Sequence, residues 1–242
     1  MPMRHAIDRL RRRLGSEEGF TLIEMLVASV IGVIVLFSML TLLDASQKAS
    51  GRVVARVDGT QRGRVAMEQV TQRLRSQICL GAAVPLIIGD ASSPTDANSV
   101  TFYSDLGNGS DFLPEKRRIY VSGTDLRERI IAGTGLPPNT TFTSTPRDRI
   151  LMQKIKPVVQ GAGNLAYFRY YKFDTATPPQ PTVELKPPLV AADANQIVQV
   201  VVAFRASSGK EDRVDTNFVN GVYSRAADSS SSDPNRRGPQ CS

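Results

Sequence analysis

The chain has 242 residues, which allows one domain of ordinary size, or one domain plus an appended segment. Hydrophobic residues make up 41% and charged residues 22%, as in a folded chain. The formal net charge of +7 favours anionic partners such as nucleic acid or phospholipid headgroups. Aromatic residues are only 6% and Trp is absent, which excludes an extensive base-stacking platform.

The amino-terminal region combines a short basic segment with a long apolar one. Residues 25–43 carry no charge, and a helix of that length covers about 28 Å, close to the ~30 Å hydrocarbon core of a bilayer. The run is longer than the apolar core of a secretory signal, and no A-x-A cleavage site follows it. We therefore predict a membrane-spanning helix; a buried core helix of a soluble domain is the alternative.

Flanking charges predict the orientation of this span. The arginines before it are at positions 4, 9, 11, 12 and 13, whereas Asp44 follows it with only Lys48 and Arg52 close by. Because cytoplasmic flanks carry the excess of Lys and Arg, the amino terminus should be cytoplasmic and residues after about 44 should lie outside the cytoplasmic membrane.

The sequence EEGFTLIE at residues 17–24 resembles the type IV prepilin processing site, in which a basic leader ends in Gly, Phe follows, and Glu is fifth in the mature chain. The resemblance implies that a prepilin peptidase cuts between Gly19 and Phe20 and methylates the new amino group of Phe20. It also implies three kinds of partner: that peptidase, other pilin or pseudopilin subunits, and an inner-membrane assembly platform.

Glu24 is an unusual residue at the start of an apolar span. Cleavage would create a charged amine at Phe20, and a charge near hydrocarbon costs ~2.5–3.5 kcal/mol unless it finds a partner. Residues four apart share one face of a helix, so Glu24 could pair with this amine within a subunit or between neighbours in a filament. Snorkelling of Glu24 toward headgroups is the alternative.

After the span, residues 44–80 contain no Pro, and their apolar residues recur at helical spacing. This pattern predicts an amphipathic continuation of the same helix, ending near Gly81. Gly51, Gly59 and Gly63 each weaken a helix by up to ~1 kcal/mol and could allow bending or local melting near the membrane.

The rest of the chain predicts strands separated by Pro and Gly. Residues 196–206 (QIVQVVVAFRA) alternate so that Val198, Val200, Val202 and Phe204 share one continuously apolar face. The other predicted strands are residues 99–104, 117–123, 126–133, 149–155 and 164–174.

A long helix followed by an antiparallel sheet predicts an α+β fold, the architecture that the pilin family shares. The length of the domain and its YYKFD and VQVVVAF segments resemble the minor pilins and J-type minor pseudopilins. The predicted organisation has five parts. Residues 1–19 are a cleaved leader, residues 20–43 a membrane-spanning half-helix and residues 44–80 an amphipathic half-helix. Residues 81–206 form a β-rich head, and residues 207–242 are a flexible carboxyl-terminal segment.

Cys79 and Cys241 are the two cysteines of the chain. Two cysteines in an oxidising compartment predict a disulfide, which would close a loop of about 160 residues and tether the carboxyl terminus. Two free thiols or a metal site are the alternatives, although the single His, His5, lies in the leader and leaves few ligands for zinc.

The sequence shows no convincing catalytic or cofactor-binding motif, so we expect a protein that is not an enzyme and needs no cofactor. With His5 removed, triads that depend on His are excluded in the mature chain. Asp105, Asn108 and Asp111 could offer oxygens to calcium, but they lack EF-hand spacing and fit a polar loop better.

Two functions remain. The first is a minor structural subunit that primes assembly or forms the tip of a type IV pilus or of a type II secretion-like filament. The second is a DNA-binding minor pilin of a DNA-uptake filament, although a solvated or packed helix fits the basic residues better. The candidate DNA patch consists of the arginines at positions 52, 56, 62, 64, 73 and 75.

Overall fold

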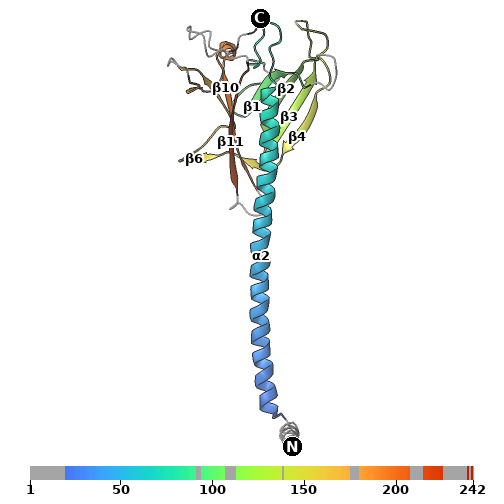
Figure 1. The fold of residues 1–242 in the computed structure, drawn as a ribbon, viewed down its shortest axis with the longest axis vertical. Helices are drawn as coiled ribbons and strands as arrows, with labels where there is room; N and C mark the ends of the chain where they lie inside the picture. Colours follow the sequence, from blue (N-terminus) through green and yellow to red (C-terminus); the bar gives the residue numbers. More distant parts are fainter. Residues whose placement is uncertain are drawn as a thin grey trace, which may run out of the picture. The chain divides into compact units, whose positions relative to one another are not determined.

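The computed structural model describes residues 20–90, 94–106, 113–137, 139–174, 180–207, 215–225, 239 and 241. The chain divides into two compact units, Met1–Arg52 and Val53–Ser242. Helix α2, Leu22–Arg75, begins in the first unit and ends in the second (Figure 1). Each unit is described separately.

In the first unit, α2 is the one helix of the described residues that is long and apolar enough to cross a membrane. Its large hydrophobic side chains between Leu22 and Leu43 are all exposed. The hydroxyls of Ser29, Ser38 and Thr41 donate to backbone carbonyls one turn earlier, at 2.8–2.9 Å. The polar groups of this segment are therefore satisfied within the helix, as a lipid environment requires.

In the second unit, α2 presents one buried face to the sheets. The buried positions recur at steps of three and four, as expected for an amphipathic helix. They are Gly59, Gly63, Ala66, Met67, Val70, Thr71, Arg73 and Leu74. Val54, Val57 and Val65 are about half exposed or more, so an apolar stripe of the same helix is left uncovered.

The glycines of α2 do not interrupt the helix, so the local melting that they could allow is not seen. A Cβ built on Gly63 would lie 2.2 Å from Cε2 of Phe218, so the missing side chain lets this ring pack directly on the helix. Gly59 is buried as well, whereas a Cβ on Gly51 would meet no atom within 4 Å.

The helix ends at Arg75, five residues before the predicted end at Leu80. The Ser76 hydroxyl donates to the Arg73 carbonyl at 2.8 Å, and Gln77 forms a β-bridge with Ser104. Tertiary pairing with β1 therefore replaces the last predicted helical turn.

The first sheet has four antiparallel strands in the order β1-β2-β3-β4. Their bounds are Ser99–Ser104, Glu115–Ser122, Asp125–Ala132 and Arg147–Met152. The inward residues include Val100 opposite Ile119, and Leu126 on β3. Strand β4 forms one edge, and the β3–β4 register shifts between Leu126 and Arg127.

The second sheet has five strands, with β11-β10-β8-β9 in order and β5 also paired with β10. The bounds of β5, β8, β9, β10 and β11 are Ile155–Lys156, Phe168–Lys172, Val183–Leu185, Gln199–Ala206 and Thr216–Tyr223. A two-stranded pair, β6 (Val159–Gln160) and β7 (Gly163–Asn164), and a 3₁₀ helix, η1 (Ala191–Asn195), complete the described elements.

One hydrophobic core joins these elements. Val70 and Leu74 of α2 and Phe102, Ile119, Phe168 and Phe204 of the sheets are all at most 1% exposed and belong to a single cluster. Figure 1 shows the carboxyl-terminal part of α2 with β2–β4 on one side and β10–β11 on the other. Tyr170 is fully buried, and its hydroxyl donates to backbone carbonyls of Asp96 and Ser99.

The α+β prediction is confirmed, because one long apolar helix precedes antiparallel sheets. The apolar face predicted for residues 196–206 is buried as expected. The predicted strand 149–155 is two strands, β4 and β5, separated by a turn at Lys154, which has φ 60°. The predicted strand 164–174 is shorter, since β8 covers only Phe168–Lys172.

The carboxyl-terminal segment 207–242 contains an element that the sequence analysis missed. Residues 216–223 form β11, which pairs with β10 along its whole length instead of belonging to a flexible segment. The alternation in TNFVNGVY is interrupted by asparagines and a glycine, so its strand pattern is weak. Pairing with the strongly apolar β10 therefore stabilises β11, whose own sequence has only a weak preference for a strand.

Candidate functional site

The amino-terminal turn of α2 holds one described part of the predicted processing and assembly site. Glu24 Oε2 accepts hydrogen bonds from Thr21 N at 2.9 Å and Thr21 Oγ1 at 3.1 Å, while Glu24 N donates to Thr21 Oγ1 at 3.3 Å. This reciprocal arrangement is a capping box, in which Thr21 is the N-cap residue and Glu24 the third helical residue. The Glu24 carboxylate therefore helps to cap the amino-terminal turn of α2.

Phe20 lies directly before this cap and is 83% exposed. Gly19 and the leader, including His5, lie outside the described residues. The pairing of Glu24 with the amine of a mature Phe20 stays a prediction, because that amine exists only after cleavage. The T-x-x-E spacing of residues 21–24 is the sequence signal for this capping role.

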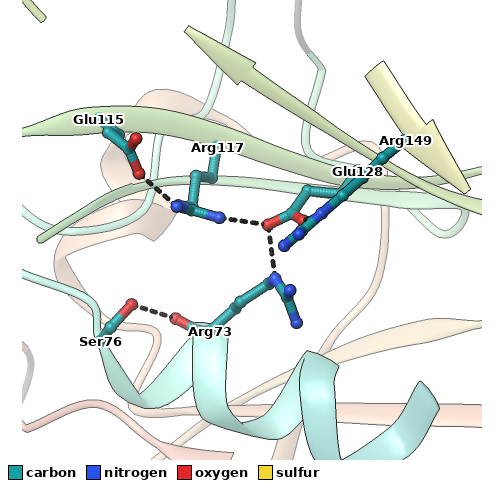
Figure 2. A network of polar contacts seen from close by, with 6 residues as sticks. All are labelled: Arg73, Ser76, Glu115, Arg117, Glu128 and Arg149. Carbon is teal, nitrogen blue, oxygen red and sulfur yellow. Dashed lines mark hydrogen bonds and ion pairs between the residues drawn. The ribbon is translucent and has the colours of Figure 1, made fainter. Parts of the chain in front are cut away.

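In the second unit, a charged cluster joins α2 to the first sheet (Figure 2). At its centre is Glu128 of β3, whose side chain is 0% exposed. Its Oε1 accepts a hydrogen bond from Arg117 Nη1 at 2.6 Å and lies 2.7 Å from Arg73 Nε. Its Oε2 accepts from Arg149 Nε, and Glu115 accepts from Nη2 of Arg117.

This cluster links four elements, since Glu128 belongs to β3, Arg73 to α2, Arg117 to β2 and Arg149 to β4. Burial lowers the pKa of Arg73, and the Glu128 carboxylate opposes that effect by favouring the charged guanidinium. A buried carboxylate is strongly destabilising without partners, so these arginines offset the cost of burying Glu128. The cluster fixes the helix end to the sheet rather than forming an open catalytic site.

The sequence contained a signal for this cluster. The segment LRERIIAG alternates so that Leu126, Glu128 and Ile130 share one face. A carboxylate between two apolar residues on the inward face predicts a buried charge that needs partners. Which arginines supply those partners depends on tertiary structure.

The candidate DNA patch is not a single surface. Arg73 is only 9% exposed and is held by Glu128, which removes it from any such patch. Arg62 pairs with Asp58 at 2.6 Å, one turn away. Arg64 and Arg75 line a groove of about 1020 Å³ between α2 and β11, but Glu68 and Asp105 line it too.

Cys79 and Cys241 form a disulfide, with Cα atoms 5.6 Å apart and a sequence separation of 162. This bond confirms the predicted pairing and excludes the alternative of two free thiols. Of the proposed calcium ligands only Asp105 falls within the described residues, since Asn108 and Asp111 lie outside them. The described residues contain no group of three or more His, Cys, Asp or Glu side chains placed to hold a metal ion.

Residues 15–40 match the family model described as the prokaryotic N-terminal methylation motif. No curated protein matches the chain. The motif covers the predicted cleavage position, the capping box and most of the apolar span, and it supports a type IV prepilin-like protein. Such a motif suggests a structural protein, and together with the apolar helix it fits a membrane-anchored pilin.

Proposed function

We propose that the protein is a minor structural subunit of a type IV pilus or of a type II secretion-like filament. A prepilin peptidase removes residues 1–19 by cutting between Gly19 and Phe20. The mature chain then stays in the cytoplasmic membrane through residues 20–43, with its head domain outside. From the membrane it enters a filament through an inner-membrane assembly platform and primes assembly or forms the tip.

The observation that carries this proposal is the exposed apolar length of α2 behind a methylation motif. Exposed large apolar residues extend past the membrane-spanning segment to Val54, Val57 and Val65. A stripe of this kind outside a bilayer calls for a protein partner, since contiguous exposed apolar surface marks interaction sites. Helices of neighbouring subunits provide an apolar surface of matching geometry.

The head domain supports a minor rather than a major subunit. Its two sheets, of four and five strands, give a large β-rich head, in line with the resemblance to minor pilins and J-type minor pseudopilins. Major pilins need a head that repeats along the whole filament, whereas a subunit at the tip or at low copy number tolerates a larger one.

Site-specific cross-linking tests the proposal. A Val57→Cys variant, whose residue is 54% exposed on the apolar stripe, should cross-link to other prepilin-like subunits in intact cells. Glu184→Cys on the exposed edge of β9 is the matched control and should cross-link far less. Both variants should appear in sheared filament fractions at low copy number.

Equal cross-linking of the two variants to unrelated membrane proteins, together with absence from every filament fraction, would refute the subunit role. Recovery of the processed chain only as a monomer in the membrane would also refute the subunit role.

A further inference from the structure

The two large sheets end in four edge strands, and three of these edges are protected. The outer edge of β1 is covered, because Ser104 bridges to Gln77 and Phe102 bridges to Leu86. Strand β4 carries exposed charged residues and a register shift against β3, and β9 is only three residues long. Covering segments, charges, bulges and short strands are the usual means by which folded proteins block the addition of a further strand.

Strand β11 is the fourth edge, and it has none of these features. Its eight residues, TNFVNGVY, include no charged residue and no Pro. They pair with β10 in an unbroken register. In the part of the chain that the structure describes, no backbone hydrogen bond reaches β11 from its other side. Strand β11 is therefore a long, regular and uncharged edge.

The register of β11 shows which of its backbone groups lie on the free edge. Ser224 N donates to the Val198 carbonyl at 2.8 Å, which makes these two residues a hydrogen-bonded pair of the β10–β11 ladder. Hydrogen-bonded and non-hydrogen-bonded pairs alternate along an antiparallel ladder. The N–H and C=O groups of residues 217, 219, 221 and 223 therefore point away from β10.

A groove of about 1020 Å³ lies between this edge and α2, within the second unit. Helix α2 lines it with Met67 and Thr71, and β11 lines it with Phe218 and Asn220. Among the described residues that line the groove, none belongs to β10, so the groove lies on the side of β11 away from its ladder partner. An extended segment in the groove would have the β11 backbone on one side and α2 on the other.

The groove carries positive charge that is not paired. Arg64, Arg75 and Arg225 line it, and none of them forms an ion pair or a hydrogen bond with another described residue. Glu68 and Asp105 line it as well, which leaves one positive charge in excess. Guanidinium groups bind carboxylates through paired donors, and Arg is enriched at protein interfaces. Acidic side chains on an incoming segment would complement these arginines.

We propose that this groove accepts a strand from another protein, an extended acidic segment that pairs with the free edge of β11. Strand addition of this kind gains affinity from main-chain hydrogen bonds and specificity from the side chains around the groove. A second copy of this chain is a poorer occupant, because each copy carries a formal net charge of +7 and the two would repel. The site does not depend on the proposed filament role.

Binding of a labelled synthetic peptide to the full chain in a non-ionic detergent tests the site. The peptide is an octapeptide of alternating threonine and valine with a glutamate at each end, and fluorescence anisotropy follows its binding. The same peptide with methylated backbone nitrogens is the control probe, because it has no backbone donors. We expect saturable binding of the first peptide and binding weaker by about tenfold or more for the second.

Val219→Pro is the variant that isolates the backbone contact. The N–H of residue 219 points away from β10, so its loss leaves the β10–β11 ladder intact but removes a donor from the free edge. Peptide binding should weaken by about tenfold or more, with Tm close to that of the parent chain. Val219→Thr keeps the N–H and is the matched control, which should bind like the parent.

A second variant tests the charge and does not alter the strand. The double variant Arg64→Gln, Arg75→Gln removes two exposed side chains that hold no partner among the described residues, so the fold should persist. It should also weaken peptide binding by about tenfold or more. Arg56→Gln is its control, since Arg56 is exposed on α2 but does not line the groove.

Three results would overturn the proposal. The first is the absence of saturable binding of the octapeptide to the folded parent chain. The second is binding that is equal in the parent chain, in Val219→Pro and in the double arginine variant. The third is self-association of the parent chain that Val219→Pro abolishes, without peptide binding, which would assign the edge to a second copy.

Discussion

Thr21 and Glu24 cap the first turn of α2 by bonding reciprocally: Glu24 accepts from Thr21 N at 2.9 Å, and Glu24 N donates to Thr21 Oγ1 at 3.3 Å. The carboxylate at the start of the apolar helix thus has a local structural role. Its predicted second role, as counter-charge to the amine of a mature Phe20, is a separate property. The two roles can be separated because capping needs an acceptor, whereas pairing with an amine needs a negative charge.

Glu24→Gln should separate these roles. Gln is accepted at this position of a capping box, so the helix should start normally and cleavage should persist. Incorporation into filaments should fall about tenfold or more, because a charge near hydrocarbon loses its partner. Quantitative immunoblots of sheared filaments, normalised to cleaved protein in the membrane, measure the effect.

Thr21→Val is the complementary variant. It removes the capping hydroxyl, at a cost of about 1 kcal/mol in helix stability, but keeps the Glu24 charge. Incorporation should be nearly normal. If Thr21→Val impairs incorporation as strongly as Glu24→Gln, capping alone explains the carboxylate and the counter-charge role is wrong.

Replacing the buried carboxylate at the centre of the cluster should destabilise the head domain. Glu128→Gln leaves the guanidinium groups of Arg73, Arg117 and Arg149 without their shared charge. Breaking a buried ion pair costs about 3–5 kcal/mol, which corresponds to a fall in Tm of about 6–20 °C for a domain of this size. Thermal unfolding of the full chain in detergent measures it.

Asp125→Asn is the matched control for Glu128→Gln. Asp125 contacts Arg127 at 3.1 Å in a pair that is partly exposed, so its loss should cost less than about 1 kcal/mol. Similar Tm values for the two variants would mean that the Glu128 cluster contributes no more than a surface pair.

Gly63→Ala should disrupt the contact between α2 and β11. The added Cβ would lie 2.2 Å from the Phe218 ring, so helix or strand must shift, and we expect a loss of about 1–3 kcal/mol despite the better helix propensity of Ala. Phe218→Leu should partly restore stability in the double variant. Gly51→Ala, which meets no atom within 4 Å, should be neutral or stabilising; an equal loss in both would implicate the helix backbone instead.

Removing the disulfide should lower stability by more than any single surface change. The bond joins residues 162 positions apart, and chain entropy predicts a contribution of about 4–5 kcal/mol. The Cys79→Ser, Cys241→Ser double variant should unfold at a lower urea concentration. Reduction of the parent chain should reproduce that midpoint, and an unchanged midpoint in both would show that the bond constrains nothing in the unfolded chain.

The features that the sequence predicted are those with strong local patterns. The apolar run at residues 25–43 and the alternation at residues 196–206 fix a helix and a buried strand without tertiary information. The disulfide followed from the presence of only Cys79 and Cys241 in a chain whose charges predict export.

The features that it missed depend on partners distant in the chain. The helix ends at Arg75 because Gln77 bridges to β1, and β11 forms because β10 offers an apolar strand to pair with. The sequence pattern predicts that Arg73 is an exposed basic residue of a helix, but in the structure it is buried in an ion pair with Glu128. No local pattern encodes these contacts.

The most direct test of the central claim is the intact mass of the chain produced with and without a prepilin peptidase. Loss of residues 1–19 and a methylated Phe20 are expected only when the enzyme is present. Gly19→Leu should keep the leader, because a side chain at this position obstructs an extended backbone in the protease groove. An unchanged mass in the presence of the peptidase, or cleavage that persists in Gly19→Leu, would contradict processing at this site.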